Sequence, residues 1–362
     1  MSPLAPRIRD IIAASGPMSV ADYMALCLFD PAHGYYTSRE PFGRGGDFVT
    51  APEISQMFGE LVAVWLHAAW DAAGRPEPFV LAEIGPGRGT LMKDMLRTFA
   101  RLDPDFAGKA RFAMVEASER LAGVQRVTLA GAPALPIWCR TVDALPPGAL
   151  FIVGNELFDA LPVRQFVRTA SGWRERCVGL DAQERLCFVA GAGAIDAALL
   201  PRGAETAAEG SIAEIAPARS ALMDTIAARF ASSGGAGLFI DYGYETPAFG
   251  DTLQAVRGHR YADVLADPGQ ADLTSHVDFA ALAAAARAHG LSPQLATQGD
   301  FLLRMGLLER AGRLGASADA ATRARLSSEV ERLAGPNAMG TLFKVLAVQP
   351  GTAVPPGFGG SD

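Results

Sequence analysis

Two carboxylates follow a buried strand in the segment FIVGNELFDALPV, residues 151–163. The apolar run stops before Asn155 and Glu156, and Asp159 comes three residues later. The two acids would share one face if a helical turn follows Asn155. Carboxylates bind cations and accept protons, and open α/β sheets bind ligands at the carboxyl ends of their strands. The alternative is a helix start, where acids satisfy backbone N–H groups.

A glycine-rich turn lies upstream, in LAEIGPGRGT. It contains Gly85, Pro86, Gly87 and Gly89, and Glu83 stands two residues before the first glycine. Glycines let the backbone turn sharply and approach a ligand without a Cβ clash. The GxGxG spacing differs from the GxGxxG of dinucleotide sites and so disfavours an oxidoreductase. An ordinary strand-to-helix turn with an exposed Glu83 is the alternative.

A second acid, Glu116, ends the next expected strand, RFAMVEAS. A carboxylate there can accept both ribose hydroxyls of an adenosine. The glycine turn with its two acids resembles class I S-adenosylmethionine-dependent methyltransferases, in which Glu83 would meet the cofactor's ammonium group. In that fold, a side chain after the third strand contacts the adenine amino group. Asp143 has this position, although a local turn bond would also explain it.

The elements that position these residues alternate from residue 79 onward. Short apolar strands are followed by helical segments, which predicts a doubly wound parallel sheet. Thr50 and Glu53 indicate a capping box for a helix that follows. The expected domains are a helical cap with a Gly-rich lid loop (1–75), a first half-sheet (76–162), an antiparallel β insertion (163–205), a second half-sheet (206–350) and a disordered tail (351–362).

Composition narrows the class of protein. The net charge of −7 disfavours a nucleic-acid binder. The chain is 49% hydrophobic, yet no apolar run is long enough for a membrane span. The four cysteines are scattered, which favours a reducing compartment. The five histidines lack metal-ligand spacing, so we expect no metal.

Several long motifs carry a resemblance to one family. These are GPMSVADYMALCLFDPAHGYY, GGDFVTAPEISQMFGE, EIGPGRGTLMKDML, GNELFDALPV, FIDYGY, ADLTSHVDFAAL and MGTLFKV. Together they span nearly the whole chain, which resembles MidA-type proteins of bacteria and mitochondria. The resemblance implies a seven-stranded methyltransferase sheet with an N-terminal helical cap and a β insertion. It also implies S-adenosyl-L-methionine as cofactor.

The resemblance further implies protein arginine methylation, on a hydrophilic subunit of NADH:ubiquinone oxidoreductase or its bacterial counterpart. No mitochondrial presequence is apparent, so a bacterial cytoplasmic protein is expected. Glu156 and Asp159 would then clamp the substrate guanidinium, and Asn155 would orient the substrate or the cofactor. Two alternatives stay open: methylation of a small molecule, and a non-catalytic assembly factor that binds the cofactor. The oligomeric state stays open as well.

Five further residues are weaker candidates. Phe48 and Thr50 could cover the cofactor as part of a lid, although a helix cap already explains Thr50. Tyr36 is a candidate for lining the substrate site. Asp241 and Tyr242, at the end of another strand, could line the same channel or merely close the sheet edge.

Overall fold

The computed structural model describes residues 2–38 and 49–359. Contacts group the chain into two compact units. The first, which we call the sheet unit, consists of Val49–Leu157, Leu222–Gly243 and Ala281–Asp362. The second, the insertion unit, consists of Met1–Phe48, Phe158–Ala221 and Tyr244–Ala280. Each unit combines separate stretches of chain, and the five consecutive domains expected from the sequence stay a prediction.

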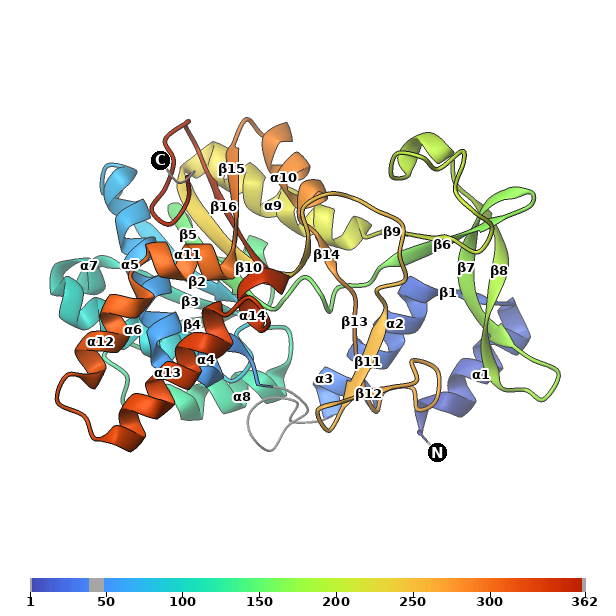
Figure 1. The fold of residues 1–362 in the computed structure, drawn as a ribbon, viewed down its shortest axis with the longest axis horizontal. Helices are drawn as coiled ribbons and strands as arrows, with labels where there is room; N and C mark the ends of the chain where they lie inside the picture. Colours follow the sequence, from blue (N-terminus) through green and yellow to red (C-terminus); the bar gives the residue numbers. More distant parts are fainter. Residues whose placement is uncertain (1, 39–48, 360–362) are drawn as a thin grey trace. The chain divides into compact units, whose positions relative to one another are not determined.

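Seven strands lie side by side in the sheet unit, in the order β15-β16-β10-β5-β2-β3-β4 (Figure 1). They are β2 (Phe79–Ile84), β3 (Arg111–Val115), β4 (Ile137–Cys139), β5 (Ala149–Asn155), β10 (Gly235–Tyr244), β15 (Ser292–Thr297) and β16 (Phe343–Gln349). β2 is parallel to both β3 and β5, whereas β16 is antiparallel to β10 and β15. The chain order changes direction between β2 and β5, where doubly wound sheets bind ligands. The predicted α/β fold is confirmed; the sheet contains the seven strands of this order and an eighth, two-residue strand outside it, β14 (Val277–Asp278).

Aromatic packing holds the helices against this sheet. Every residue of β2 and β5 is buried, as their unbroken apolar sequences predict for central parallel strands. Phe106, on α7 (Pro104–Lys109), meets the rings of Trp70, Phe79 and Phe99 at centroid distances of 4.9, 5.1 and 5.0 Å. Such pairs contribute about 0.5–1.5 kcal/mol each beyond their buried area. They therefore fix the helices α5 (Gln56–Ala72) and α6 (Thr90–Leu102) beside the strand ends.

The helix expected after Thr50 is interrupted. A short helix, α4 (Ala51–Ile54), ends at Ser55, whose extended backbone (φ −156°, ψ 138°) separates it from α5. Thr50 makes no side-chain cap bond, and Ser55 Oγ instead accepts from the N–H of Met57 at 3.3 Å. Glu53 accepts a hydrogen bond from Thr90 Oγ1 on α6. The predicted capping box is therefore wrong, because tertiary contacts engage Glu53 elsewhere.

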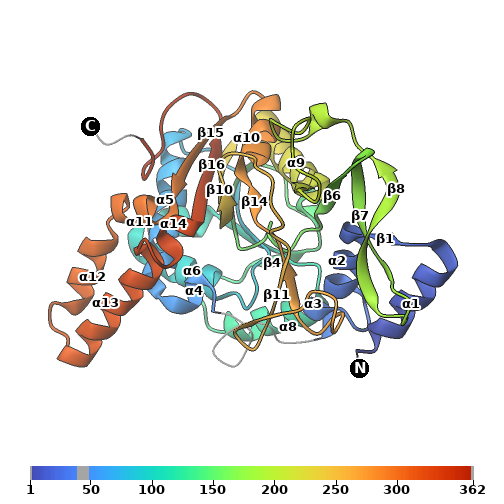
Figure 2. The same ribbon diagram turned by 45° about the vertical axis from the view of Figure 1, so that its right-hand side comes forward.

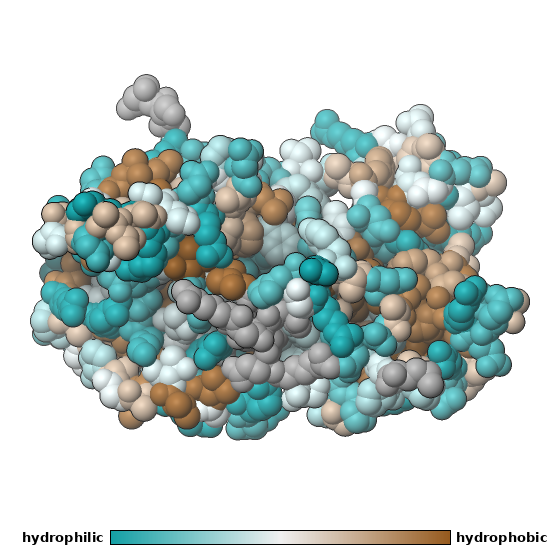
Figure 3. All heavy atoms as spheres, turned by 60° about the horizontal axis from the view of Figure 1, so that its bottom comes forward, coloured by the Kyte–Doolittle hydropathy of each residue, from teal (hydrophilic) through white to brown (hydrophobic). Residues whose placement is uncertain are grey.

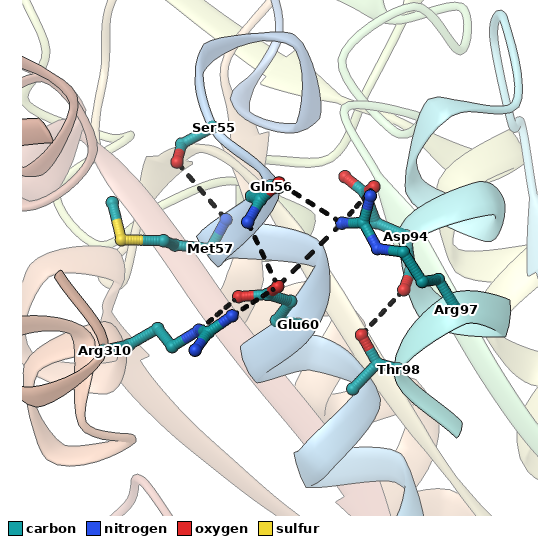
Figure 4. Close-up of polar contacts among 8 residues, drawn as sticks. All are labelled: Ser55, Gln56, Met57, Glu60, Asp94, Arg97, Thr98 and Arg310. Atoms are coloured by element: carbon teal, nitrogen blue, oxygen red, sulfur yellow. Dashed lines mark hydrogen bonds and ion pairs between the residues drawn. The ribbon is translucent and has the colours of Figure 1, made fainter. Parts of the chain in front are cut away.

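A partly buried ionic network ties α5, α6 and α12 (Leu307–Gly315) together (Figure 4). Both carboxylate oxygens of Glu60 accept from Arg310, at 2.7 and 2.9 Å. Arg97 lies 3.0 Å from Asp94 and 3.9 Å from Glu60. Burial raises the pKa of Asp94 to about 6. Helices α12 and α13 (Ala320–Ala334) lie side by side in Figures 1 and 2, so the network anchors this helix pair to the sheet unit.

The C-terminal tail, expected to be disordered, contacts the core as far as residue 359. The indole N–H of Trp65 donates to the carbonyl of Pro356 at 3.1 Å. The ring of Phe358 packs on Phe301 with centroids 5.5 Å apart. A buried indole requires an acceptor, and the tail supplies it. The expectation of disorder is therefore wrong for residues 351–359.

The insertion unit contains the predicted antiparallel meander. It comprises β6 (Arg164–Thr169), β7 (Gly172–Leu180) and β8 (Leu186–Ala194), joined by β9 (Ile212–Ile215) and β1 (Met18–Ser19). The unit also contains the helices α1 (Leu4–Ser15), α2 (Val20–Phe29) and α3 (Tyr35–Ser38), and a small sheet of β11 (Gln254–Arg257), β12 (Arg260–Ala262) and β13 (Asp272–Thr274). A buried guanidinium, that of Arg219, donates to the carbonyls of Asp159, Leu161 and His276 at 3.1, 3.1 and 2.7 Å. It holds the segment after Asp159 against the segment around His276.

On the face drawn in Figure 3, hydrophobic residues are interspersed with hydrophilic ones. Among the residues that the structure describes, no helix combines the length and apolar character of a membrane span.

Candidate active site

The glycine turn joins β2 to α6. Gly85, Gly87 and Gly89 all have positive φ, at 64°, 50° and 82°, a region that favours glycine. The N–H of Gly89 donates to the carbonyl of Pro86 at 2.7 Å and closes the turn. A Cβ on Gly85 would lie 2.7 Å from Cδ1 of Leu157. The turn therefore packs directly on the segment that follows β5.

Glu83 lies at the end of β2 and is buried. The N–H of Met92 donates to its carboxylate, yet Oε2 has no hydrogen-bond partner among the described residues. Burial raises the pKa of Glu83 well above its usual value, and the negative charge of Glu116 raises it further. A buried acceptor without a partner costs about 1–3 kcal/mol. Oε2 is thus suited to accept from a cationic ligand group, which would also favour the ionised form.

Glu116 follows β3 and is half-buried. Its Oε1 accepts from the N–H of Ser118 at 2.7 Å, and its Oε2 accepts from Nε2 of Gln125 at 3.0 Å. Burial raises the pKa of Glu116, and these two hydrogen bonds oppose the rise. They engage two of the about four acceptor positions of a carboxylate. An oriented carboxylate of this kind can accept from a vicinal diol.

Two further candidate residues, Asn155 and Glu156, lie at the end of β5. Nδ2 of Asn155 donates to Oε1 of Glu156 at 3.0 Å, and the N–H of Ala51 donates to the same oxygen at 3.1 Å. Oδ1 of Asn155 is buried and without a partner in the described part of the chain. Glu156 has φ 51°, and its N–H bonds to the carbonyl of Ile240 at 2.8 Å. The expected helical turn after Asn155 is wrong, because Glu156 adopts a left-handed conformation while its N–H stays bonded to β10.

Asp159 belongs to the insertion unit, whereas Glu156 belongs to the sheet unit. Within the insertion unit, Tyr36 donates its hydroxyl to Oδ1 of Asp272 at 2.9 Å. Burial raises the pKa of Tyr36 well above its usual value, and the charges of Asp272 and Asp159 raise it further. Asp159 and Asp272 are both buried. The unit therefore brings the candidate tyrosine close to two acids, and the joint action of Glu156 and Asp159 stays a prediction.

The weaker candidates have contacts of their own. Asp143 is exposed in the short turn Val142–Ala144. Burial lowers the pKa of Arg229, and the negative charge of Asp143 opposes that shift. Asp241 is fully buried in β10 and accepts from the N–H of Tyr242 at 2.9 Å. The Tyr242 ring packs on Phe343 with centroids 5.4 Å apart. The roles of these residues, and that of Thr50, stay predictions.

Phe48 and the expected lid loop around it lie outside the described residues.

Sequence reasoning missed two residues that the structure connects to the site. Gln125 bonds to Glu116, and Asp272 bonds to Tyr36. Gln125 was detectable as a lone polar side chain on the apolar face that Leu121 begins in α8 (Glu119–Thr128). Asp272 lay within the quoted motif ADLTSHVDFAAL but had no neighbouring signal that set it apart.

The chain is similar over most of its length to known proteins. Residues 61–297 match the model of a family described as "Putative S-adenosyl-L-methionine-dependent methyltransferase". The mitochondrial protein arginine methyltransferase NDUFAF7 of Homo sapiens is 36% identical, across 96% of this chain and 84% of its own. That of Danio rerio is also 36% identical, across 93% and 84%. A solved structure from Burkholderia thailandensis, bound to S-adenosylhomocysteine, is 32% identical with a TM-score of 0.85, across 98% of this chain and 93% of its own.

The chain belongs to this family of S-adenosyl-L-methionine-dependent methyltransferases, and the resemblance to MidA-type proteins is confirmed. It is an enzyme whose methyl donor is S-adenosyl-L-methionine. The residues fit this cofactor on independent grounds, since Glu83 Oε2 is a buried acceptor without a partner among the described residues. In the adjacent turn, three positions, Gly85, Gly87 and Gly89, have positive φ and no side chain.

Proposed function

We propose that this chain methylates an arginine side chain of a protein. The observation that carries the proposal is the likeness, over nearly the whole chain, to relatives named protein arginine methyltransferase. We further propose a hydrophilic subunit of NADH:ubiquinone oxidoreductase, or its bacterial counterpart, as the substrate, and the bacterial cytoplasm as the location. The acids at the end of β5 support an arginine, because a planar guanidinium pairs well with carboxylates.

The cofactor site is assigned to the carboxyl ends of the central strands. Glu83 would hold the ammonium group, Glu116 the ribose and Asp143 the adenine. The backbone of the glycine turn would lie close to the cofactor, and Phe48 and Thr50 would cover the cofactor. The turn residues are Gly85, Pro86, Gly87 and Gly89. The unpartnered Oε2 of Glu83 supports this assignment.

The acids have a chemical task in arginine methylation. S-adenosylmethionine supplies, when bound, a methyl group on a positively charged sulfur. A guanidinium stays protonated near neutral pH, and its delocalised lone pairs make it a poor nucleophile. Carboxylates of Glu156 and Asp159 would fix its plane, draw positive charge from the attacking nitrogen and accept the proton released. Asn155 would orient the substrate, and Tyr36, Asp241 and Tyr242 would line its path.

The test is the chemical form of the transferred methyl group. The purified chain is incubated with methyl-labelled S-adenosylmethionine and proteins from cells that lack its gene. We expect label in methylarginine after hydrolysis, and a peptide map then locates the site. Label only in other residues or in small molecules would overturn the proposal.

Variants test the two acids. Glu156→Gln and Asp159→Asn should each lower kcat about 100-fold or more, the range for a lost proton acceptor, while S-adenosylhomocysteine affinity changes less than about threefold. Glu184→Gln, at an exposed turn of the insertion unit, is the matched control and should behave as wild type. Wild-type turnover in both site variants would show that the acids do not clamp the substrate.

A further inference from the structure

A buried glutamine connects three parts of the cofactor site. Gln125, on α8, has no exposed surface. Its Nε2 donates to the carbonyl of Gly87 at 2.8 Å and to Oε2 of Glu116 at 3.0 Å. Its Oε1 accepts from the indole Nε1 of Trp138 on β4 at 2.9 Å. One amide therefore joins the glycine turn, the acid after β3 and the edge strand.

The three partners allow one orientation of this amide. An indole N–H only donates, whereas the Gly87 carbonyl and the Glu116 carboxylate only accept. If the amide of Gln125 were rotated by 180°, its oxygen would face two oxygens and its NH₂ would face the indole donor. Trp138 thus fixes the amide, and the amide fixes one carboxylate oxygen of Glu116. The N–H of Ser118 holds the other oxygen at 2.7 Å.

We propose that Gln125 is a positioning residue for ribose recognition. It holds the Glu116 carboxylate in the orientation that accepts the two ribose hydroxyls, and Trp138 keeps the amide aligned for this task. The inference rests on the proposed assignment of Glu116 to the ribose. If so, the preference for ligands with both ribose hydroxyls depends on Gln125, although the amide of Gln125 bonds only to protein atoms.

A purely structural role must be separated from this one. Gln125 also packs near the glycine turn, since a Cβ on Gly89 would lie 3.5 Å from its Cγ. Loss of packing would weaken every ligand alike, whereas loss of positioning weakens a ligand with both hydroxyls more than a ligand with only one. A pair of ligands differing in one hydroxyl therefore distinguishes the two roles.

The experiment is calorimetric titration with S-adenosylhomocysteine and its 2′-deoxy analogue. Wild type should prefer the diol ligand about 10- to 100-fold, as expected for hydrogen bonds to a carboxylate. Gln125→Met keeps the length and burial of the side chain and removes the amide. It should reduce the preference to about threefold or less, because the affinity for the diol ligand falls more than the affinity for the analogue. Trp138→Phe keeps an aromatic ring at this position, removes the indole donor and should give an intermediate loss of preference.

Matched controls separate the possible failures. Gln294→Met, on β15, should keep the wild-type preference. An unchanged preference in Gln125→Met together with its loss in Glu116→Gln would overturn the positioning role alone. No preference in wild type, or one that survives Glu116→Gln, would overturn the ribose assignment as well. If Gln125→Met does not fold, Trp138→Phe decides: wild-type preference in that variant contradicts the proposal.

Discussion

Two buried oxygens at the ends of adjacent strands, Glu83 Oε2 and Asn155 Oδ1, have no hydrogen-bond partner among the residues that the structure describes. Buried acceptors are rarely left in this state, because each loses its hydration without compensation. Both lie in the sheet unit near the point where the strand order changes direction. A ligand that donates hydrogen bonds at this edge would satisfy them, and S-adenosylmethionine has such donors in its ammonium and ribose groups.

Cofactor binding should weaken as the pH falls through the raised pKa of Glu83. Burial raises this pKa, and only the carboxylate form pairs with the ligand's ammonium. Ligand binding therefore favours the ionised form of Glu83. At a pH below the raised pKa, where Glu83 is protonated in the free protein, binding releases the proton of Glu83. Titrations of S-adenosylhomocysteine in buffers with different ionisation enthalpies measure that release.

The control for this proton release is Glu83→Gln. The amide cannot ionise, so the variant should bind about tenfold or more weakly and lose the part of the proton release that Glu83 contributes. A pH profile and proton release identical to wild type would show that Glu83 does not meet the ammonium group.

At the scale of elements, the contact between α5 and α6 sets the position of the glycine turn, since α6 begins directly after it. Gly59 of α5 packs tightly against α6. A Cβ there would lie 2.7 Å from Cβ of Asp94 and 3.4 Å from Cδ1 of Leu91. Backbone and side-chain atoms near helix axes cannot easily give way.

Gly59→Ala should lower the free energy of unfolding by about 1–3 kcal/mol, because overpacking outweighs the helix preference of alanine. Gly312→Ala, on α12, meets no atom within 4 Å and should raise it by about 0.5–1 kcal/mol. Urea denaturation of both variants measures the difference. Equal stabilisation by the two substitutions would contradict the described packing.

The central strands, which are buried on both faces, were predictable from the sequence. The points at which helices and strands end were not. β2 and β5 are unbroken apolar runs, because helices cover both faces of a doubly wound sheet. The break at Ser55 and the left-handed Glu156 arise from contacts with residues far away in the chain, which local propensity does not encode. The same applies to Gln125, whose partners come from three elements.

At the scale of the whole molecule, the candidate residues divide between the two units. The proposed cofactor residues that the structure describes, Glu83 and Glu116 among them, lie in the sheet unit. Tyr36, Asp159 and Asp272 lie in the insertion unit. We therefore expect variants of the insertion unit to affect substrate turnover more than cofactor affinity.

The most direct test of the account is calorimetric titration of the full chain with S-adenosylhomocysteine, for wild type, Glu116→Ala and Glu119→Ala. Glu119 begins α8 and has an exposed side chain, so its variant is a matched control. We expect one binding site in wild type and in Glu119→Ala, and about 10- to 100-fold weaker binding in Glu116→Ala, which loses the acceptor for the ribose hydroxyls. Equal affinity in all three proteins, or no binding to the folded wild type, would contradict it.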